Sequence, residues 1–282
     1  MIPDLPIDEL ARRYNNGAAV PDWQRTLLPR WQRDSERMRD DGSGYRDVVY
    51  GTRERNRLDV FTPRGTSPPA GWPALVFVHG GYWQWLGKDD WSAIAAPFVG
   101  NGMAAVIVGY TLCPQTSIRG IADEIETAIA YVHKTGTGLS LDRDRLALAG
   151  HSAGGHLTAW CMTTDWTSRG LPATPFVAAT AISGLFDLEP LVPIYLNDAL
   201  RLDNAEALAM SPAYRARRVD CEFTAAVGGD ELPEFGRQNA LLGTAWPGVR
   251  GWTLPALNHF SIVDQLTRDD TPLFQHVARA LA

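Results

Sequence analysis

One short stretch of the chain carries the residue types that covalent acyl-transfer chemistry requires. Ser152 lies at the centre of the sequence Gly-His-Ser-Ala-Gly, after the apolar run 146–149 and before a helical pattern. A serine hydroxyl can attack a carbonyl when it stands clear of its own backbone, within reach of a base. A strand, a sharp turn and a helix provide that geometry, and the small flanking residues let strand and helix pass close together. We therefore predict that Ser152 is a nucleophile; the alternative is a structural serine in a tight turn.

A general base for Ser152 must come from one of six histidines. His259 follows the last predicted strand, so it should lie at the sheet edge where Ser152 stands. His133 and His276 lie in helical patterns. His151 and His156 flank the serine in sequence, and His79 stands at a strand end before a glycine pair. His259 is therefore the predicted base.

The base needs a carboxylate that fixes its tautomer and stabilises the imidazolium. Asp230 follows the predicted strand 222–227 through two glycines, and the chain order serine, acid, histidine is the one found in enzymes with such a serine turn. We prefer Asp230 because the paired glycines let the chain turn immediately before it. Glu231 is the adjacent alternative. Asp187 is the next, but we expect it to hold its own segment or at most to contact substrate.

Backbone amides must also stabilise the oxyanion that forms during acyl transfer. The sequence His-Gly-Gly-Tyr-Trp, residues 79–83, follows the apolar run 74–78, and its two glycines let amides turn toward the nucleophile. We predict that the N–H groups of Gly81, Tyr82 and Ala153 form the oxyanion hole. A plain glycine turn without this role is the alternative.

Strand-like runs alternate with helical patterns along most of the chain. The predicted strands are 45–50, 56–62, 74–78, 103–110, 146–149, 177–182, 222–227 and 250–254, and the predicted helices include 89–99, 117–134, one starting at 154, 234–245 and 272–281. Such alternation predicts an α/β fold with a mostly parallel sheet of about eight strands and helices on both faces. We expect one domain over residues 1–282.

Two segments interrupt this alternation. Residues 1–44 carry a broken helical pattern and are predicted to form an N-terminal helical arm that packs on the body or overhangs a cleft. Residues 186–214 are rich in proline and aromatic residues and are predicted to form a cap-like insertion over the active-site edge. Trp83 and Trp85, after the glycine pair, and Tyr195, in the insertion, are the expected substrate-binding residues; packing in the core is the alternative.

The composition limits the partners and the compartment. The net charge is −6 without a run of Lys or Arg, which argues against nucleic acid, and no apolar run approaches the roughly 18 residues of a membrane span. No signal peptide is visible, and three widely separated cysteines fit reduced thiols better than disulfides or a zinc site. We expect a cytoplasmic protein without metal or cofactor that acts on a small molecule. The oligomeric state is left open between a monomer and a homodimer.

These pieces together resemble the α/β-hydrolase fold and, within it, the arylformamidase (kynurenine formamidase) group and its bacterial esterase-like relatives. The stretches that carry the resemblance are residues 79–84, 150–156, 228–231 and 258–260. It implies hydrolysis of N-formyl-L-kynurenine to kynurenine and formate, a step of tryptophan catabolism, together with activity on small aryl esters. Two alternatives remain: a carboxylesterase of broad small-acyl specificity, and a non-catalytic binding protein on a hydrolase scaffold.

Overall fold

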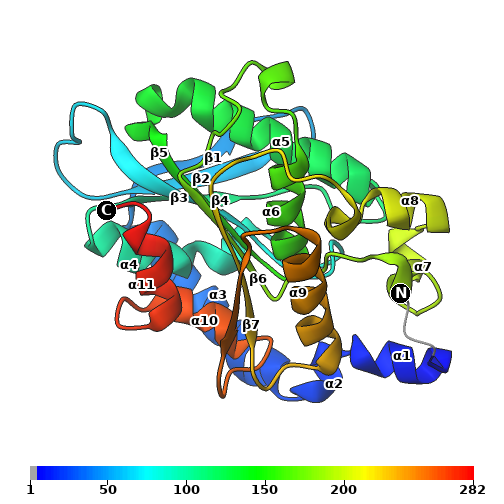
Figure 1. Cartoon of the computed structure of the whole chain (residues 1–282). Helices are drawn as coiled ribbons and strands as arrows, with labels where there is room; N and C mark the ends of the chain where they lie inside the picture. Colours follow the sequence, from blue (N-terminus) through cyan, green and yellow to red (C-terminus); the bar gives the residue numbers. More distant parts are fainter. Residues whose placement is uncertain (1–4) are drawn as a thin grey trace.

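A single sheet of eight strands runs through the molecule (Figure 1). The computed structural model describes residues 5–282. The strands lie in the order β1-β2-β4-β3-β5-β6-β7-β8; neighbours from β4 onward are parallel, whereas β2 is antiparallel to both β1 and β4. Their bounds are β1 Ser43–Val49, β2 Arg57–Thr62, β3 Trp72–Val78, β4 Ala104–Val108, β5 Leu141–His151, β6 Ala178–Ile182, β7 Glu222–Gly228 and β8 Arg250–Leu254. The predicted mostly parallel sheet is confirmed.

Helices cover both faces of the sheet (Figure 1). One face carries α5 Ile118–Thr135, α6 Ala153–Thr163 and α9 Pro233–Ala245. The other face carries α3 Trp23–Asp41, α4 Ala95–Gly100 and α11 Pro272–Arg279. The shorter helices are α1 Ile7–Arg13, α2 Asn16–Ala19, α7 Asn197–Leu200, α8 Asn204–Ala209 and α10 Ser261–Asp264. Within residues 5–282, no helix has both the length and the apolar character needed to span a membrane.

The central strands are apolar because both of their faces are covered. Along β3, Val76 and Val78 pack into the core on the side of α5 and α6, whereas Leu75 and Phe77 pack into the core on the side of α3 and α4. Side chains of a strand alternate between the two faces of its sheet, so an uninterrupted apolar run fills both cores at once. This sandwich holds the carboxyl ends of the parallel strands at one edge.

The helices begin and end where local chemistry allows. The hydroxyl of Ser117 accepts a hydrogen bond from the Gly120 amide and caps α5, which is the helix predicted over 117–134. The helix predicted over 89–99 is a 3-10 helix, Lys88–Ile94, followed by α4. Pro97 has no N–H for the Ala93 carbonyl, so a continuous α-helix would lack that hydrogen bond.

The N-terminal segment from α1 to α3 lies across the carboxyl edge of the sheet and is attached on both sides of it. On one side, Tyr14 donates its hydroxyl hydrogen to Glu234 of α9 at 3.0 Å. On the other side, the indole N–H of Trp31 donates to Asp264 of α10 at 2.5 Å. These attachments anchor the arm to the body of the protein.

Residues 186–214 fold as short helical turns that are largely built into the core. They comprise the 3-10 helix Glu189–Leu191, α7, α8 and the 3-10 helix Pro212–Tyr214. Their apolar side chains join the core on the α6 side; these are Phe186, Leu188, Leu191, Ile194, Leu196, Leu200, Leu202, Ala207, Met210 and Ala213. Asp187 pairs with Arg237 of α9 at 3.2 Å, so it holds this segment in place. A role of the segment as a cap over the active site stays a prediction.

Candidate active site

Ser152 occupies a strained turn between β5 and α6. Its backbone has φ 57° and ψ −115°, a conformation that non-glycine residues rarely adopt. The neighbouring glycines permit the tight crossing: a Cβ on Gly150 would lie 2.2 Å from the Gly154 carbonyl oxygen, and one on Gly154 would lie 2.0 Å from the Val78 carbonyl oxygen. The turn therefore presents the serine hydroxyl at the carboxyl edge of the sheet, as the sequence predicts.

His259 lies within hydrogen-bond reach of the serine. It belongs to the loop between β8 and α10, and its Nε2 is 3.0 Å from Ser152 Oγ. Both side chains are buried. When Nε2 carries no hydrogen it accepts the hydroxyl hydrogen, which is the contact that a general base needs. The geometry thus brings together the predicted nucleophile and the predicted base.

The carboxylate that contacts His259 belongs to Glu231 and not to Asp230. Glu231 Oε2 accepts the hydrogen of His259 Nδ1 at 2.7 Å. Glu231 Oε1 accepts from the Gly228 amide at 2.7 Å and from the Ser183 hydroxyl at 2.5 Å. Both carboxylate oxygens are therefore held in place. The preference for Asp230 was wrong for this contact, and the adjacent alternative is the one that reaches the imidazole.

The turn after β7 explains the one-residue difference. The Glu231 amide donates to the Gly228 carbonyl at 3.3 Å, so residues 228–231 form a β-turn with Asp230 at its third position. The side chain at that corner is exposed, and the Asp230 amide is bonded to the Leu257 carbonyl. The fourth position returns toward the strand end. Glu231 therefore points back to the histidine.

The amides expected to form an oxyanion hole lie in a loop of unusual backbone conformation. Gly81, Tyr82 and Trp83 have φ of 107°, 47° and 57° in succession. The amides of Gln84 and Trp85 both donate to the Gly81 carbonyl at 2.9 Å, which holds the loop closed.

This loop lies against the nucleophile. A Cβ on Gly80 would lie 3.1 Å from the Ser152 Cβ. The amides of Gly81, Tyr82 and Ala153 donate no hydrogen bond within residues 5–282. Successive amides in a left-handed turn, and an amide at a helix N-terminus, are groups that can bind an anion. The oxyanion-hole role of Gly81, Tyr82 and Ala153 stays a prediction.

A second histidine supports the loop that carries His259. His151 is fully buried, and this burial holds its pKa well below the usual value, so the ring is neutral. Its Nε2 lies 2.8 Å from the His259 carbonyl oxygen, which can only accept a hydrogen bond. Nε2 of His151 therefore carries the hydrogen. His151 acts on the position of His259 through its backbone.

A cavity of about 420 Å³ opens onto Ser152 and His259. Because eight of its lining residues are Trp, Tyr or Phe, we call it the aromatic cavity. It is lined by Tyr14, Asn15, Asn16, Gly17, Trp23, Gln24, Leu28, Trp31, Gly81, Tyr82, Trp85, Leu86, Trp91, His151, Ser152, Tyr195, His259 and Phe260. The rings of Trp23 and Phe260 stack with centroids 4.6 Å apart. This lining includes no Asp, Glu, Lys or Arg side chain.

The three predicted substrate-binding residues are placed differently. Trp85 and Tyr195 line the aromatic cavity and are 53% and 46% exposed. Trp83 is fully buried and packs edge-on against His156 in the core, with ring centroids 5.1 Å apart. The prediction for Trp83 is therefore wrong: the left-handed turn directs this side chain inward, and the packing alternative holds.

Much of the cavity wall comes from the N-terminal arm, whose residues the sequence reasoning did not assign to the site. These are Tyr14, Asn15, Asn16, Gly17, Trp23, Gln24, Leu28 and Trp31. The signal available was the sequence Tyr-Asn-Asn at residues 14–16 and the expectation that the arm overhangs a cleft. Neither specifies which side chains meet Ser152, since that contact joins distant parts of the chain.

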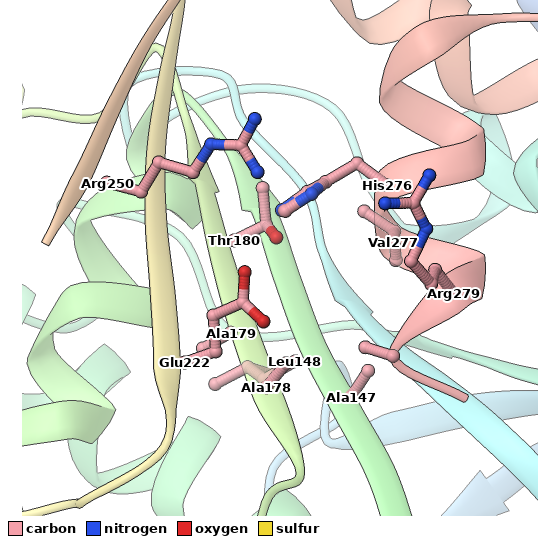
Figure 2. A pocket seen from close by; sticks show the side chains of 11 residues that line it. Ala147, Leu148, Ala178, Ala179, Thr180, Glu222, Arg250, His276, Val277 and Arg279 are labelled. Carbon is pink, nitrogen blue, oxygen red and sulfur yellow. The ribbon is translucent and has the colours of Figure 1, made fainter. Parts of the chain in front are cut away.

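A second cavity, of about 160 Å³, lies near the opposite ends of the strands, where β6, β7 and β8 begin (Figure 2). We call it the amino-end cavity. Figure 2 shows Glu222, Arg250 and His276 around the same space. Burial, partly offset by Glu222, lowers the pKa of His276. Within residues 5–282, no group of three or more His, Cys, Asp or Glu side chains is arranged to hold a metal ion.

Comparison with known proteins gives consistent results. The BD-FAE family model matches residues 58–171. Kynurenine formamidase of Danio rerio is 31% identical over 276 residues, which cover 95% of this chain and 92% of that protein. A crystal structure from Silicibacter sp. TM1040, whose name proposes a thioesterase, superposes with a TM-score of 0.84 at 32% identity over 96% of this chain and 99% of that one. Esterase B of Lactobacillus rhamnosis shares the fold, with a TM-score of 0.70 at 17% identity over 95% and 96% of the two chains.

Proposed function

The chain belongs to the kynurenine formamidase family and is a hydrolase, and on this premise we propose that Ser152, His259 and Glu231 form its catalytic triad and that its substrates are aryl formamides such as N-formyl-L-kynurenine. The observation that carries this proposal is the continuous chain of hydrogen bonds from Glu231 through His259 to Ser152, which opens onto the aromatic cavity. An arylamine leaving group fits walls made of indole and phenyl rings.

The first half of the reaction acylates the enzyme. His259 Nε2 takes the hydroxyl hydrogen as Ser152 Oγ attacks the formyl carbon, and the oxyanion lies against the amides of Gly81, Tyr82 and Ala153. Each such donor contributes on the order of 10² to 10³ in rate. The imidazolium then gives its Nε2 proton to the leaving nitrogen, the C–N bond breaks, and kynurenine departs.

The second half releases formate. Water gives a proton to His259 Nε2 and attacks the formyl ester on Ser152; the C–O bond to the serine breaks, and Ser152 Oγ recovers the proton. Throughout, Glu231 keeps the hydrogen of His259 on Nδ1, which leaves Nε2 free to exchange the proton with substrate. The carboxylate also stabilises the imidazolium present between the two proton transfers.

A broad carboxylesterase is the second candidate. It would use the same catalytic groups, and the esterases that share this fold support it as an alternative. The two functions differ in what the acyl side must hold, because a formyl group needs almost no room and a butyryl group needs a pocket. A non-catalytic binding protein is the third alternative, and reaction with a fluorophosphonate probe would exclude it.

One comparison of substrates tests the assignment. Steady-state kcat/KM is measured on a single preparation for N-formyl-L-kynurenine, p-nitrophenyl acetate and p-nitrophenyl butyrate. We expect efficient hydrolysis of N-formylkynurenine and a fall from acetate to butyrate. If p-nitrophenyl butyrate is by far the best substrate and turnover of the formamide is negligible, the esterase assignment replaces the formamidase assignment.

The cellular setting follows from the same proposal. We propose a cytoplasmic enzyme of tryptophan catabolism whose partner is a small-molecule amide or ester and not nucleic acid. The net charge of −6 and the absence of a run of Lys or Arg argue against nucleic acid as a partner. Fractionation of the source cells with an antibody against the chain would test the compartment, and recovery in the membrane pellet would contradict it.

A further inference from the structure

One polar group in the wall of the aromatic cavity has no partner. Asn16, the first residue of α2, is 4% exposed and lines the cavity together with Ser152 and His259. Its Oδ1 accepts no hydrogen bond within residues 5–282. A buried acceptor left without a donor costs free energy, so such groups call for an explanation.

The orientation of the Asn16 amide is fixed by its neighbour Tyr82. Burial raises the pKa of Tyr82 well above its usual value, so its hydroxyl keeps its single hydrogen. That hydrogen goes to the Tyr14 carbonyl oxygen at 2.7 Å. The Tyr82 oxygen can therefore only accept from Asn16, whose Nδ2 lies 3.4 Å away. The nitrogen is committed to Tyr82, and the oxygen remains available as an acceptor.

The neighbouring residue Asn15 provides a comparison, because its side-chain oxygen does accept a hydrogen bond. Asn15 also lines the cavity, but its Oδ1 accepts from the Ala18 amide at 3.0 Å and caps α2. The free acceptor is therefore a property of Asn16 and not of the segment. With no Asp, Glu, Lys or Arg in the lining, polar recognition in this cavity depends on neutral groups of this kind.

We propose that Asn16 Oδ1 accepts a hydrogen bond from an N–H donor on the leaving-group side of the substrate, and so determines the preference for substrates whose leaving group carries such a donor over those whose leaving group lacks one. This inference rests on the proposed formamidase function. The formyl side of an aryl formamide carries no donor, so the donor belongs to the amine. Two sources supply it: the N–H of the scissile formamide, and the α-ammonium group of an amino-acid side chain on the ring. A site built to bind such a donor discriminates against the analogue that lacks it.

The test measures the ratio of kcat/KM between wild type and Asn16→Ala for three substrates: N-formyl-L-kynurenine, formanilide and phenyl formate. We expect a loss for N-formylkynurenine at least tenfold larger than the loss for phenyl formate. An equally large loss for formanilide assigns the donor to the formamide N–H, whereas a loss confined to N-formylkynurenine assigns it to the ammonium. Asn204→Ala, at an exposed asparagine of α8 that does not line the aromatic cavity, is the matched control and should change the ratio of formamide to ester activity by less than about twofold.

Two results would overturn the inference. Equal losses for the ester and the formamides would show that Asn16 acts only by supporting Tyr82, and equal activity of variant and wild type would show that it binds no donor. The fluorophosphonate reaction rate at Ser152 and the melting temperature of each variant establish that fold and triad are intact. If wild type itself hydrolyses no formamide, the proposed function fails; the inference about Asn16 fails separately when wild type is active and the losses match.

Discussion

The two cavities lie at opposite ends of the strands and differ in the state of their polar groups. The aromatic cavity holds a buried hydroxyl and a buried imidazole that are bonded to each other. The amino-end cavity is lined by Glu222, Arg250 and Arg279, which are exposed (Figure 2). Exposed charges are solvated by water and interact weakly, whereas buried groups act on one another strongly. The candidate site is therefore distinguished by buried polar groups that are hydrogen-bonded to each other, and not by the presence of a cavity alone.

Backbone strain separates the two regions as well. Ser152 and the loop from Gly81 to Trp83 have positive φ beside the aromatic cavity. The strands that begin at the amino-end cavity, β6 to β8, pair in regular parallel register. Strain persists where the surrounding structure holds it and where it serves a purpose, such as presenting a hydroxyl and free amides to a carbonyl. The parallel strands end regularly at the amino-end cavity and in a strained turn at the aromatic cavity.

The largest expected effect contrasts the two cavities directly. Ser152→Ala removes the proposed nucleophile and should lower kcat for N-formylkynurenine by about 10⁴-fold or more, because the members of a catalytic triad act as a unit. Arg250→Gln, in the amino-end cavity, should change kcat by less than about twofold. Both are measured by steady-state kinetics after circular dichroism has confirmed the fold. Undiminished turnover by purified Ser152→Ala, or a large loss in Arg250→Gln, would move the active site elsewhere.

A second substitution tests the strained loop. Gly81→Ala should lower kcat by about 10² to 10³-fold, because an added Cβ would lie 2.2 Å from the Trp85 carbonyl oxygen and displace the proposed oxyanion amides. Gly65→Ala is the matched control: Gly65 has a similar φ of 102°, but its Cβ would meet nothing within 4 Å. The control carries the same backbone strain away from the site and should keep full kcat. Comparable losses in both variants would refute a special role for the loop.

The dependence of stability on acid should differ between the buried His156 and the half-buried His276. Burial lowers the pKa of His156 to about 4, and its Nε2 bonds to the Met210 carbonyl oxygen. Below about pH 6.5 the unfolded chain binds a proton that the folded chain rejects, so this contribution is complete above pH 6.5 and is lost as the pH falls toward 4. Each such histidine contributes about 1.4 kcal/mol per pH unit in that window.

The measurement is urea unfolding between about pH 7 and about pH 5. His156→Gln keeps a donor for Met210 but cannot titrate, so the free energy of unfolding should fall less steeply with acid than in wild type. His276→Gln, in the amino-end cavity, should change the slope less. Identical slopes in wild type and His156→Gln would show that His156 does not titrate as described.

The smallest expected effect concerns the aromatic wall. Trp85→Ala should raise KM for N-formylkynurenine several-fold with a smaller change in kcat, because an exposed ring contributes binding area and no chemistry. Trp83→Ala, two residues earlier, should instead reduce the free energy of unfolding by about 3 to 5 kcal/mol through loss of a buried aromatic ring. Kinetics and urea titrations on both variants separate the two roles. If Trp83→Ala raised KM and Trp85→Ala lowered the free energy of unfolding, the side chain of Trp83 would have to line the cavity.

The sequence predicts the fold well because parallel strands covered on both faces are continuous apolar runs. Each of the eight predicted strands overlaps an observed one, and the periodic helix over 117–134 is α5. The positions of the proposed nucleophile and base follow equally from local rules, since the carboxyl ends of parallel strands share one edge. Ser152 and His259 are found in contact for that reason.

The remainder of the site depends on details that a pattern does not specify. The register of one turn decides whether Asp230 or Glu231 returns to the strand end, and both lie after the same glycine pair. Successive left-handed residues decide that Trp83 enters the core while Trp85 lines the cavity. The contribution of the arm, including Asn16, requires contacts across more than sixty residues, which local propensities do not encode.

The most direct test of the triad measures kcat for Glu231→Gln and Asp230→Asn on the same formamide substrate. An amide nitrogen in place of Glu231 Oε2 would donate toward His259 Nδ1 and favour the wrong tautomer, so Glu231→Gln should lose about 10⁴-fold. Asp230→Asn changes an exposed turn corner and should stay within about twofold of wild type. A large loss in Asp230→Asn with Glu231→Gln near wild type would contradict the account.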